Sequence, residues 1–479
     1  MQLRPPKPLE CRPRDSKALQ KLSQARTGNL MPVIQIKRGL DIPVQGSVSN
    51  FAVADAWEAP HAALLPVEVV GIKTKLLVKE GDAVQVGTPL FLDRRDETVL
   101  FTSPSSGKIK AIHRGQRRMV LAVVIERDGN DSQIEENTKA PSKQDPAALR
   151  DTLCRTGLWT ALRQRPFGRI AQSGDSPAAL FITGTDSRPL AVSPHTLVAN
   201  RQDEFVAGAQ ALASLTEGPT WLCTNPNDDW SDFIAPGIQQ QEFSGPHPSG
   251  LPGTHMHQLG PAGTKQILWQ IGAVDVADIG EFLLSGKQTV RRTVAVTGPA
   301  ATKPRLLRTW NGMGMEFATQ EEQSVEAIRV VSGSLLDGRT ANTGTPEGFL
   351  GRWDSQISIV SEQTRREMLA WMFPFGGRHT LTNTLLDKFF RSKFKYDADL
   401  NGSPRAIVPI GSWEEINALD ILPTQLIKSL ASGDIETAEK LGALELVEED
   451  VALWEYACPS KSPITRWLRN TLSQIEKEG

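Results

Sequence analysis

The sequence predicts a multidomain α+β fold, and three observations support this prediction. Short apolar segments separated by glycine and proline turns run to about residue 127, as antiparallel strands require. From Ala147 onward, apolar strands alternate with helical segments, which favours a mostly parallel sheet. The C-terminal part is helical in pattern. At 479 residues and 52.4 kDa, the chain is too long for one core, so roughly three or four domains are expected.

The clearest pattern lies between Leu76 and Ile112. Residues 78–87 and 103–109 match the two halves of a lipoyl- or biotinyl-type β-sandwich. Carrier domains of this shape place a modifiable lysine on the hairpin between the halves, but here residues 92–98 read LDRRDET. An arginine guanidinium stays protonated and cannot be acylated by biotin or lipoate. The sequence therefore predicts a sandwich that serves as architecture.

The remaining elements follow from apolar periodicity and helix-start signals. In the α/β part, helices are predicted at 146–156 and 202–213, and strands at 178–184, 220–224 and 265–271. A small β-rich unit begins after Arg291, with strands at 293–298 and 329–335. Near the C-terminus, helices are predicted from Pro423, which suits a first helical turn, and at 434–441, 448–457 and 463–476.

These patterns divide the chain into five parts. They are a basic extension (1–30), a barrel-sandwich domain (31–130), a Rossmann-like α/β domain (131–290), a β-grasp unit of the SLBB type (291–365) and a helical domain (366–479). The extension holds seven basic and two acidic residues, a net charge of +5. It is interpreted as a disordered tail, as an over-long start before Met31, or as an arm for an anionic surface.

Composition excludes several functional classes. The formal net charge of −2 argues against a general nucleic-acid binder. No run of about 18 apolar residues occurs, so no transmembrane helix is expected. The four cysteines (Cys11, Cys154, Cys223 and Cys458) are scattered and show neither a CxxC motif nor the spacing of a disulfide framework. This pattern fits a reducing cytoplasm. No GxGxxG, GxxxxGKS/T or GxSxG motif is present, so a common nucleotide site or a serine nucleophile is not expected.

Two clusters are candidates for binding. His255 and His257 would lie on one side of an extended segment and, with His247, could bind a metal; alternatively, these histidines bond to backbone in a structural loop. The second cluster, residues 163–169, reads RQRPFGR. Its arginines and Phe167 could hold a carbonyl-bearing ring by hydrogen bonds and stacking, or form a solvated loop.

Together these segments resemble a known family, the A subunits of sodium-translocating NADH:quinone reductases (Na+-NQR). The matching stretches are residues 36–46, 78–87, 103–120, 156–167, 245–257 and 419–479. The resemblance covers the chain from Met31 onward, and the extension 1–30 has no counterpart in the family pattern.

The family is similar to the flavin-bearing NADH subunit of complex I and to the C subunit of the Rnf complex. These relatives carry a glycine-rich flavin loop where this chain has Leu158 and Trp159, whose bulk removes the close backbone approach that a flavin phosphate needs. The Rnf relatives also carry a four-cysteine iron–sulfur motif near the C-terminus. This chain retains only Cys458 of that motif, because other residues occupy the earlier ligand positions: Glu448, Val451 and Trp454. One cysteine cannot hold a cluster that needs four thiolates.

The resemblance therefore implies a cofactor-free, peripheral subunit on the cytoplasmic side of the bacterial inner membrane, with no catalytic residue or metal of its own. NAD(H), flavins and the iron–sulfur centre would belong to sister subunits, and the integral membrane B subunit would be a main partner. Ubiquinone is the implied substrate. The implied quinone-binding residues are Leu65, Val69, Val70, Ile72, Arg163, Arg165, Pro166 and Phe167, with Arg163 or Arg165 meeting a quinone oxygen. Two alternatives remain: residues 65–72 are a core strand, or the chain is a structural docking subunit with the quinone site on its membrane partner.

Overall fold

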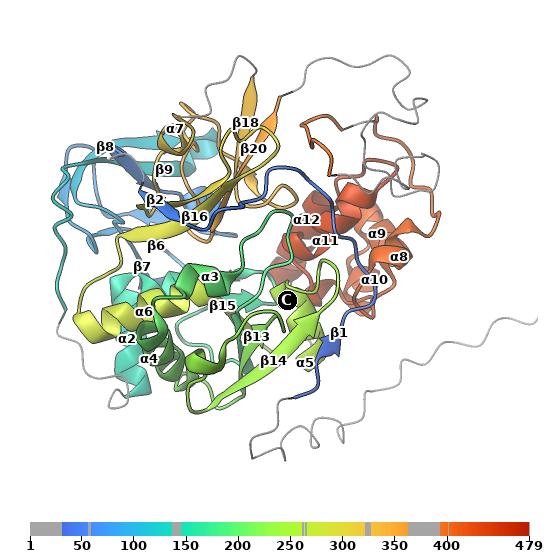
Figure 1. The fold of residues 1–479 in the computed structure, drawn as a ribbon, viewed down its shortest axis with the longest axis horizontal. Coiled ribbons are helices and arrows are strands. Elements are labelled where there is room, and N and C mark those ends of the chain that lie inside the picture. The colour runs from blue at the N-terminus through green and yellow to red at the C-terminus, as the bar shows by residue number, and fades with distance from the viewer. Residues whose placement is uncertain are drawn as a thin grey trace, which may run out of the picture.

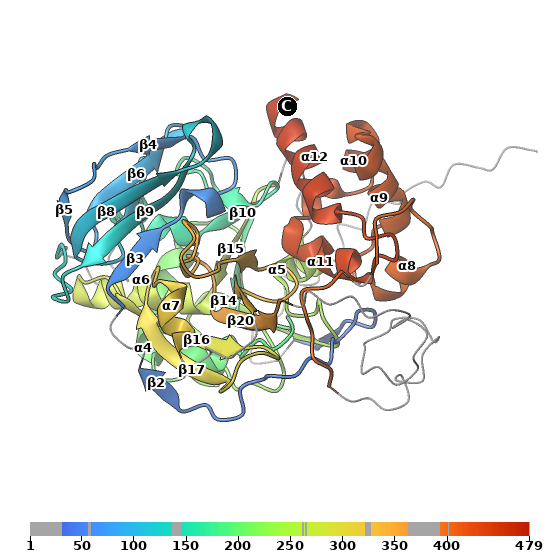
Figure 2. The same ribbon diagram turned by 90° about the horizontal axis from the view of Figure 1, so that it is seen from above.

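The computed structural model describes residues 31–55, 59–136, 145–260, 263, 266–320, 327–362, 393–400 and 402–478. Within these ranges the strands form four sheets, and a group of helices follows at the C-terminal end (Figure 1, Figure 2). The predicted extension, residues 1–30, lies outside the described residues. None of the helices in the described ranges has the length and apolar character needed to cross a membrane.

The predicted β-sandwich is present as two antiparallel sheets. One sheet has the order β3 (His61–Leu64), β9 (Val120–Arg127), β8 (Gly107–Arg114), β5 (Ala83–Val84), and the other β4 (Thr74–Leu76), β6 (Pro89–Asp93), β7 (Asp96–Thr102). On the neighbouring strands β6 and β7, the buried rings of Phe91 and Phe101 stack with centroids 4.6 Å apart. Arg94 and Arg95 form the tip of the β6–β7 hairpin, where a carrier domain would present its lysine.

The alternative interpretation of residues 65–72 as a core strand is wrong. Strand β3 ends at Leu64, and a 3-10 turn, η1 (Pro66–Glu68), follows. Pro66 occupies the first position of this turn, where its missing N–H is tolerated. Leu65 is buried, whereas Val69, Val70 and Ile72 are half-buried.

A seven-stranded sheet forms the predicted α/β part. Its order is β1 (Ile34–Gln35), β14 (Ile238–Ser244), β13 (Thr220–Thr224), β12 (Ala179–Thr183), β15 (Leu268–Gly272), β10 (Arg163–Arg165), β11 (Arg169–Ile170). The first five strands run parallel, β10 pairs antiparallel with β15, and β11 pairs antiparallel with β10. The accompanying helices are α2 (Pro146–Thr156), α3 (Pro194–Val198), α4 (Gln202–Ala213), α5 (Pro252–Leu259) and α6 (Ala273–Ser285). The predicted elements β12, β13, β15, α2 and α4 are thus confirmed.

Helices α4 and α6 pack closely because two glycines face across their contact. A Cβ atom on Gly208 would lie 2.0 Å from the carbonyl oxygen of Val276, and one on Gly280 would lie 1.6 Å from that of Glu204. Both distances are far below van der Waals contact, so only glycine fits at these positions.

The β-rich unit after residue 290 is a six-stranded sheet, as Figure 2 shows beside the sandwich. Its order is β19 (Arg339–Thr340), β18 (Ile328–Ser332), β20 (Gln356–Ser361), β16 (Arg291–Thr297), β17 (Arg305–Trp310), β2 (Val53–Asp55), and α7 (Met315–Ala318) lies beside it. Two strands that precede the sandwich in sequence pair elsewhere: β1 with β14, and β2 with β17. The N-terminal segment therefore crosses several parts of the molecule.

The predicted C-terminal helices are confirmed. They are α9 (Pro423–Ser432), α10 (Ile435–Lys440), α11 (Glu448–Ala457) and α12 (Ile464–Glu478), and a short helix that was not predicted, α8 (Ser412–Ile416), precedes them. Asp434 caps α10 by accepting a hydrogen bond from the N–H of Thr437. Trp413, Leu426, Trp454 and Leu468 are buried in the centre of this group.

Arg165 joins the helical group to the seven-stranded sheet. It lies on β10 with 1% of its surface exposed. Its guanidinium donates to Asp450 at 2.5 Å, to Glu449 at 3.1 Å and to the carbonyl oxygen of Glu445 at 3.1 Å. Asp450 also accepts a bond of 2.8 Å from the N–H of Val447, which caps α11. These acceptors offset the free-energy cost of removing the guanidinium from water, and they fix α11 against β10.

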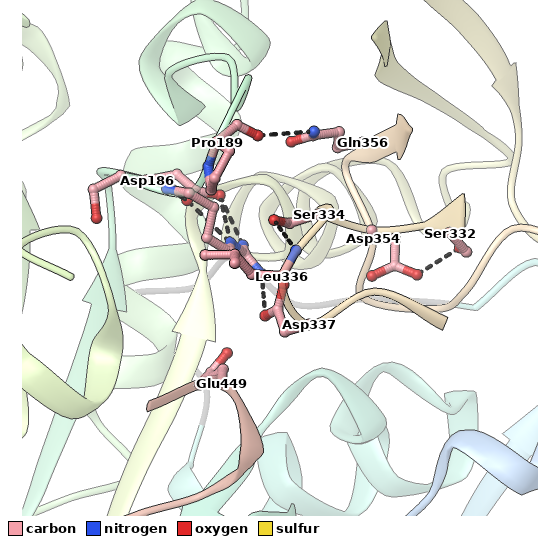
Figure 3. Close-up of polar contacts among 12 residues, drawn as sticks. Asp186, Pro189, Ser332, Ser334, Leu336, Asp337, Asp354, Gln356 and Glu449 are labelled. Carbon is pink, nitrogen blue, oxygen red and sulfur yellow. Dashed lines mark hydrogen bonds and ion pairs between the residues drawn. The ribbon is translucent and has the colours of Figure 1, made fainter. Parts of the chain in front are cut away.

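A second arginine joins three parts of the chain (Figure 3). Arg188 pairs with Asp186 at 2.7 Å, and it donates across the junction to Asp337 at 3.2 Å. Figure 3 shows Glu449 of α11 approaching the same junction from the helical group. Burial raises the pKa of Asp337 although Arg188 opposes the shift. The seven-stranded sheet, the six-stranded sheet and α11 therefore meet in one largely buried ionic junction.

Glu68 of η1 joins the sandwich to the six-stranded sheet. Its carboxylate accepts 3.1 Å hydrogen bonds from the guanidinium of Arg339 and from the main-chain N–H of Arg352. Burial raises the pKa of Glu68 from 4.5 to about 7, with Asp354 adding to the rise and Arg339 opposing it. The carboxyl group is thus poised between its two protonation states near neutral pH.

Replacing Arg165 by leucine is expected to loosen the helical group. Glu449 and Asp450 would remain buried without their cation, at a cost of about 3–5 kcal/mol. Hydrogen exchange of the α11 amides should then accelerate, whereas exchange in β16 and β20 should not change. The exposed Arg38 provides the control, because Arg38→Leu should alter stability by less than about 0.5 kcal/mol. Unchanged exchange in α11 would show that apolar packing alone holds the helices.

The raised pKa of Glu68 predicts that stability falls as the pH rises from about 4.5 to about 7. In that window the folded chain binds more protons than the unfolded chain, so the free energy of unfolding decreases by up to about 3 kcal/mol. The Glu68→Gln variant has no ionisable group at this position, so its free energy of unfolding should not show this decrease. Urea unfolding of both proteins at a pH near each end of the window should show the variant gaining relative to wild type as the pH rises. An identical difference at both ends would contradict the prediction.

Candidate functional site

Residues 65–72 lie between two cavities that share Val69 and Phe101 as lining residues. The central cavity has an empty volume near 770 Å³, open solvent included. It is lined by Leu65 and Val69, by residues of the α/β part and by residues of the segments that flank the strands of the six-stranded sheet. The lateral cavity, near 400 Å³, is lined by Val69 and Val70 and by residues of β11. Val69 and Val70, which the family resemblance selects, therefore lie beside Arg169 and Ile170 of β11.

The central cavity is mainly apolar. Leu65, Phe101 and Leu158 form its wall on the sandwich and α/β side, and Trp353 closes it from the six-stranded sheet. The indole N–H of Trp353 donates to the carbonyl oxygen of Thr160 at 3.2 Å, which fixes the ring. Glu68 lines the same cavity. A titratable carboxyl group thus borders an apolar space at the junction of three sheets.

Arg169, which lines the lateral cavity, keeps one donor without an acceptor among the described residues. Arg169 on β11 pairs with Glu476 of α12 through one of its terminal nitrogens. Its Nε–H is buried and has no hydrogen-bond partner among the described residues. Val99, Phe101 and Ile170 supply apolar surface around it. A buried donor without an acceptor is costly, so the cavity is suited to a ligand that carries an acceptor oxygen.

Carboxylates in the lateral cavity are already occupied. Asp93 pairs with Arg95 at 2.9 Å. Burial raises the pKa of Asp96, but hydrogen bonds from Thr98 and Ser173 outweigh it and hold this pKa below its ordinary value. Asp96 therefore remains ionised while it fixes the hairpin to residue 173. Among these groups, the Nε–H of Arg169 is the donor that remains unused.

Arg165 is bound by partners within the chain. Its guanidinium is consumed by Glu449, Asp450 and Glu445, and the side chain is sealed from solvent. Arg165 therefore cannot meet a quinone oxygen without breaking these ion pairs. Its neighbour Pro166 is also buried.

Arg163 and Phe167 lie away from both cavities. Arg163 lines a third cavity, near 750 Å³, at the ends of β12 and β15. It lies 3.9 Å from Glu449, and its guanidinium is 5.8 Å from the ring centroid of Trp353. Phe167 packs against the core of the helical group. The structure thus separates the arginine cluster into side chains with different surroundings, and only Arg169 of this cluster reaches Val69 and Val70.

The histidine segment is helical, so the extended arrangement considered for it is wrong. His255 and His257 lie on α5, where positions two apart point about 200° away from each other. His255 bonds to the carbonyl oxygen of Ser249 at 2.9 Å, and His257 pairs with Glu445 at 2.6 Å. Burial lowers the pKa of His255 to about 4. In the described part of the chain, no three His, Cys, Asp or Glu side chains are grouped to hold a metal ion.

Sequence patterns alone did not distinguish Glu68 and Arg169 as site residues. Arg169 was part of the predicted cationic cluster, but nothing local separates it from Arg163 or Arg165. The distinguishing feature is the position of β11 at the sheet edge facing the sandwich, which depends on tertiary structure.

Three family models match the chain. Residues 34–128 match "NqrA N-terminal barrel-sandwich hybrid domain", residues 144–288 match "NqrA second alpha/beta domain", and residues 293–343 match "NQRA C-terminal domain", a model of the SLBB type. Together they cover the sandwich, most of the seven-stranded sheet and part of the six-stranded sheet.

Curated relatives match over most of the chain. The A subunit of the Na(+)-translocating NADH-quinone reductase of Shewanella amazonensis is 39% identical over 450 residues, covering 93% of this chain and all of the relative. The corresponding protein of Hahella chejuensis is 39% identical over 452 residues, and that of Neisseria meningitidis serogroup B is 40% identical over 451, with the same coverage. The chain therefore belongs to the family of A subunits of the Na+-translocating NADH-quinone reductase.

Proposed function

We propose that the chain is a peripheral, quinone-associated subunit of a Na+-translocating NADH:quinone reductase, and that a quinone head group binds in the lateral cavity. The observation that carries this proposal is the buried Nε–H of Arg169, which faces no acceptor in the described chain. A quinone carbonyl oxygen would accept this hydrogen bond.

The apolar residues that the resemblance selects are assigned to the ring and tail. Val69 and Val70 would flank the ring with Phe101, and Ile72 would meet the first part of the isoprenoid tail at the outer face of the sandwich. Leu65 lies on the central cavity, which extends the same apolar region inward. In this arrangement Arg169 takes the role that sequence comparison gave to Arg163 or Arg165.

Electron entry is assigned to sister subunits. Where a flavin loop would need small residues, Leu158 and Trp159 are 8% and 0% exposed and fill the space. The ring of Trp159 packs edge-on against Trp269 at 5.3 Å. Cys458 is buried in the helical core. The proposal therefore gives NADH oxidation, flavins and the iron–sulfur centre to other subunits, with the integral membrane B subunit as a neighbour on the cytoplasmic side of the inner membrane.

Binding of a short-chain ubiquinone to the purified chain tests the proposed site. Arg169→Met should weaken binding by about tenfold or more, because a hydrogen bond from a charged donor contributes about 1.5–3 kcal/mol. Val69→Trp should abolish binding by filling the space on both sides of residue 69. Isothermal calorimetry or fluorescence titration would measure both effects.

Two controls separate ligand contact from structural damage. Glu476→Gln breaks the ion pair of Arg169 but leaves its Nε–H in place, so it should retain binding. Arg163→Met removes a nearby cation that does not line the lateral cavity, and it should also retain binding. If the folded wild-type chain shows no saturable binding, the chain has a docking role only, and the quinone site belongs to the membrane partner.

A further inference from the structure

A groove on the outer face of the sandwich carries a cluster of arginines. Arg94 of the β6–β7 hairpin lines it together with Arg114, the last residue of β8, and Arg118 of the β8–β9 connection. Ile72, Leu76 and Met119 supply apolar surface, and none of its lining residues is acidic. The groove has an empty volume near 930 Å³ that includes open solvent. We refer to it as the arginine groove.

The arginines of this groove are not neutralised by neighbouring carboxylates. Within the described chain, none of Arg94, Arg114 and Arg118 forms an ion pair, and the guanidinium of Arg114 donates only to the carbonyl oxygen of Arg118, at 3.3 Å. The nearby carboxylates have other partners: Asp93 pairs with Arg95 at 2.9 Å, and Glu97 pairs with Lys75 at 3.0 Å. A chain with a net charge of −2 thus presents an uncompensated positive surface at one end of its sandwich.

The backbone holds this surface in an unusual conformation. Arg117 and Arg118 have φ values of +53° and +61°, in the left-handed region that residues with a Cβ rarely adopt. The turn is closed by hydrogen bonds between Gly115 and Met119, at 2.8 Å, and between Met119 and Gln116, at 3.1 Å. As a result, Met119 projects outward with 53% of its surface exposed. Non-glycine residues in such a conformation often mark functional sites.

We propose that the arginine groove and the Met119 turn bind an anionic phospholipid surface. Guanidinium groups hydrogen-bond well to phosphate oxygens. Met119 would enter the acyl boundary beside Leu76 and Ile72, while the arginine stems lie along apolar surface and their charged heads stay among the phosphates. A cationic ring around a protruding apolar side chain is the pattern of an interfacial contact.

The geometry favours a lipid surface over an acidic peptide. The cations come from two separate turns at one end of the sandwich, so they face a surface and not a single extended chain. The edge strand on this side, β4, spans only Thr74–Leu76. Addition of a peptide strand relies on a longer free edge. The cations of the arginine groove do not line the lateral cavity, so replacing them tests the lipid contact without changing the proposed contact of Arg169 with a quinone.

Co-sedimentation of the full chain with vesicles tests the proposal. Vesicles of phosphatidylcholine with added phosphatidylglycerol should bind the chain, and pure phosphatidylcholine should not. The triple variant Arg94→Gln, Arg114→Gln, Arg118→Gln should bind about a hundredfold more weakly, because each arginine near an anionic surface contributes about fivefold. Met119→Ser should weaken binding further, and its effect should persist at high salt, which screens only the charges.

A matched triple variant controls for total charge. Arg38, Arg308 and Arg466 are exposed elsewhere, and their replacement by glutamine removes the same charge while leaving the groove intact. Binding should stay near the wild-type level. Equal losses in both triple variants would overturn the proposal, as would equal binding to both kinds of vesicle. If vesicle binding is absent and the groove variant instead fails to join the assembled complex, the groove binds an acidic segment of a neighbouring protein of the complex, and the lipid assignment is wrong.

Discussion

Arg165 carries a positive charge into the interior of the molecule, and the arrangement of the C-terminal helices depends on how that charge is compensated. Two carboxylates of α11 and one carbonyl oxygen surround its guanidinium. Asp450 serves twice, because it binds Arg165 and also caps α11 at Val447. The same α11 turn presents Glu449 toward Arg163 and Gln270. Because removing one member of a buried ion pair leaves the others uncompensated, this constraint fixes α11 against β10 and β15.

Local patterns predicted much of the fold because they report local physics. Pro423 at a first helical turn predicted a helix start that the structure confirms, and the helix predicted at 434–441 is present as α10. Short runs rich in buried apolar residues likewise predicted β12 and β13. The predictions were wrong where residues distant in the sequence determine the local structure. His255 and His257 suit an extended segment by spacing, but α5 forms because Pro252 begins a helix whose buried face packs against the sheet.

The candidate site was only partly predictable for the same reason. The sequence shows a cluster of arginines, but it does not show which of them is neutralised. Arg165 is separated from Asp450 by 285 positions and Arg169 from Glu476 by 307, so neither partner is visible in a local window. Even with those partners known, the free Nε–H of Arg169 follows only from the packing of β11 against residues 69–70. The apolar residues were easier to select, since their type alone favours contact with an apolar ligand.

The sandwich shows how a scaffold can change use when one residue type replaces another. At the hairpin where a carrier domain presents a lysine, this chain presents Arg94 and Arg95, and their surroundings assign them different roles. Arg95 is held by Asp93 and by Glu476 of α12, so it ties the hairpin to the helical group. Arg94 has no such partner among the described residues and faces the arginine groove. A lysine in a carrier must be free to move and to accept a covalent group, whereas a guanidinium keeps its charge and its planar set of donors. The exchange therefore removes covalent chemistry from the hairpin and leaves one arginine for internal structure and one for an external anionic surface.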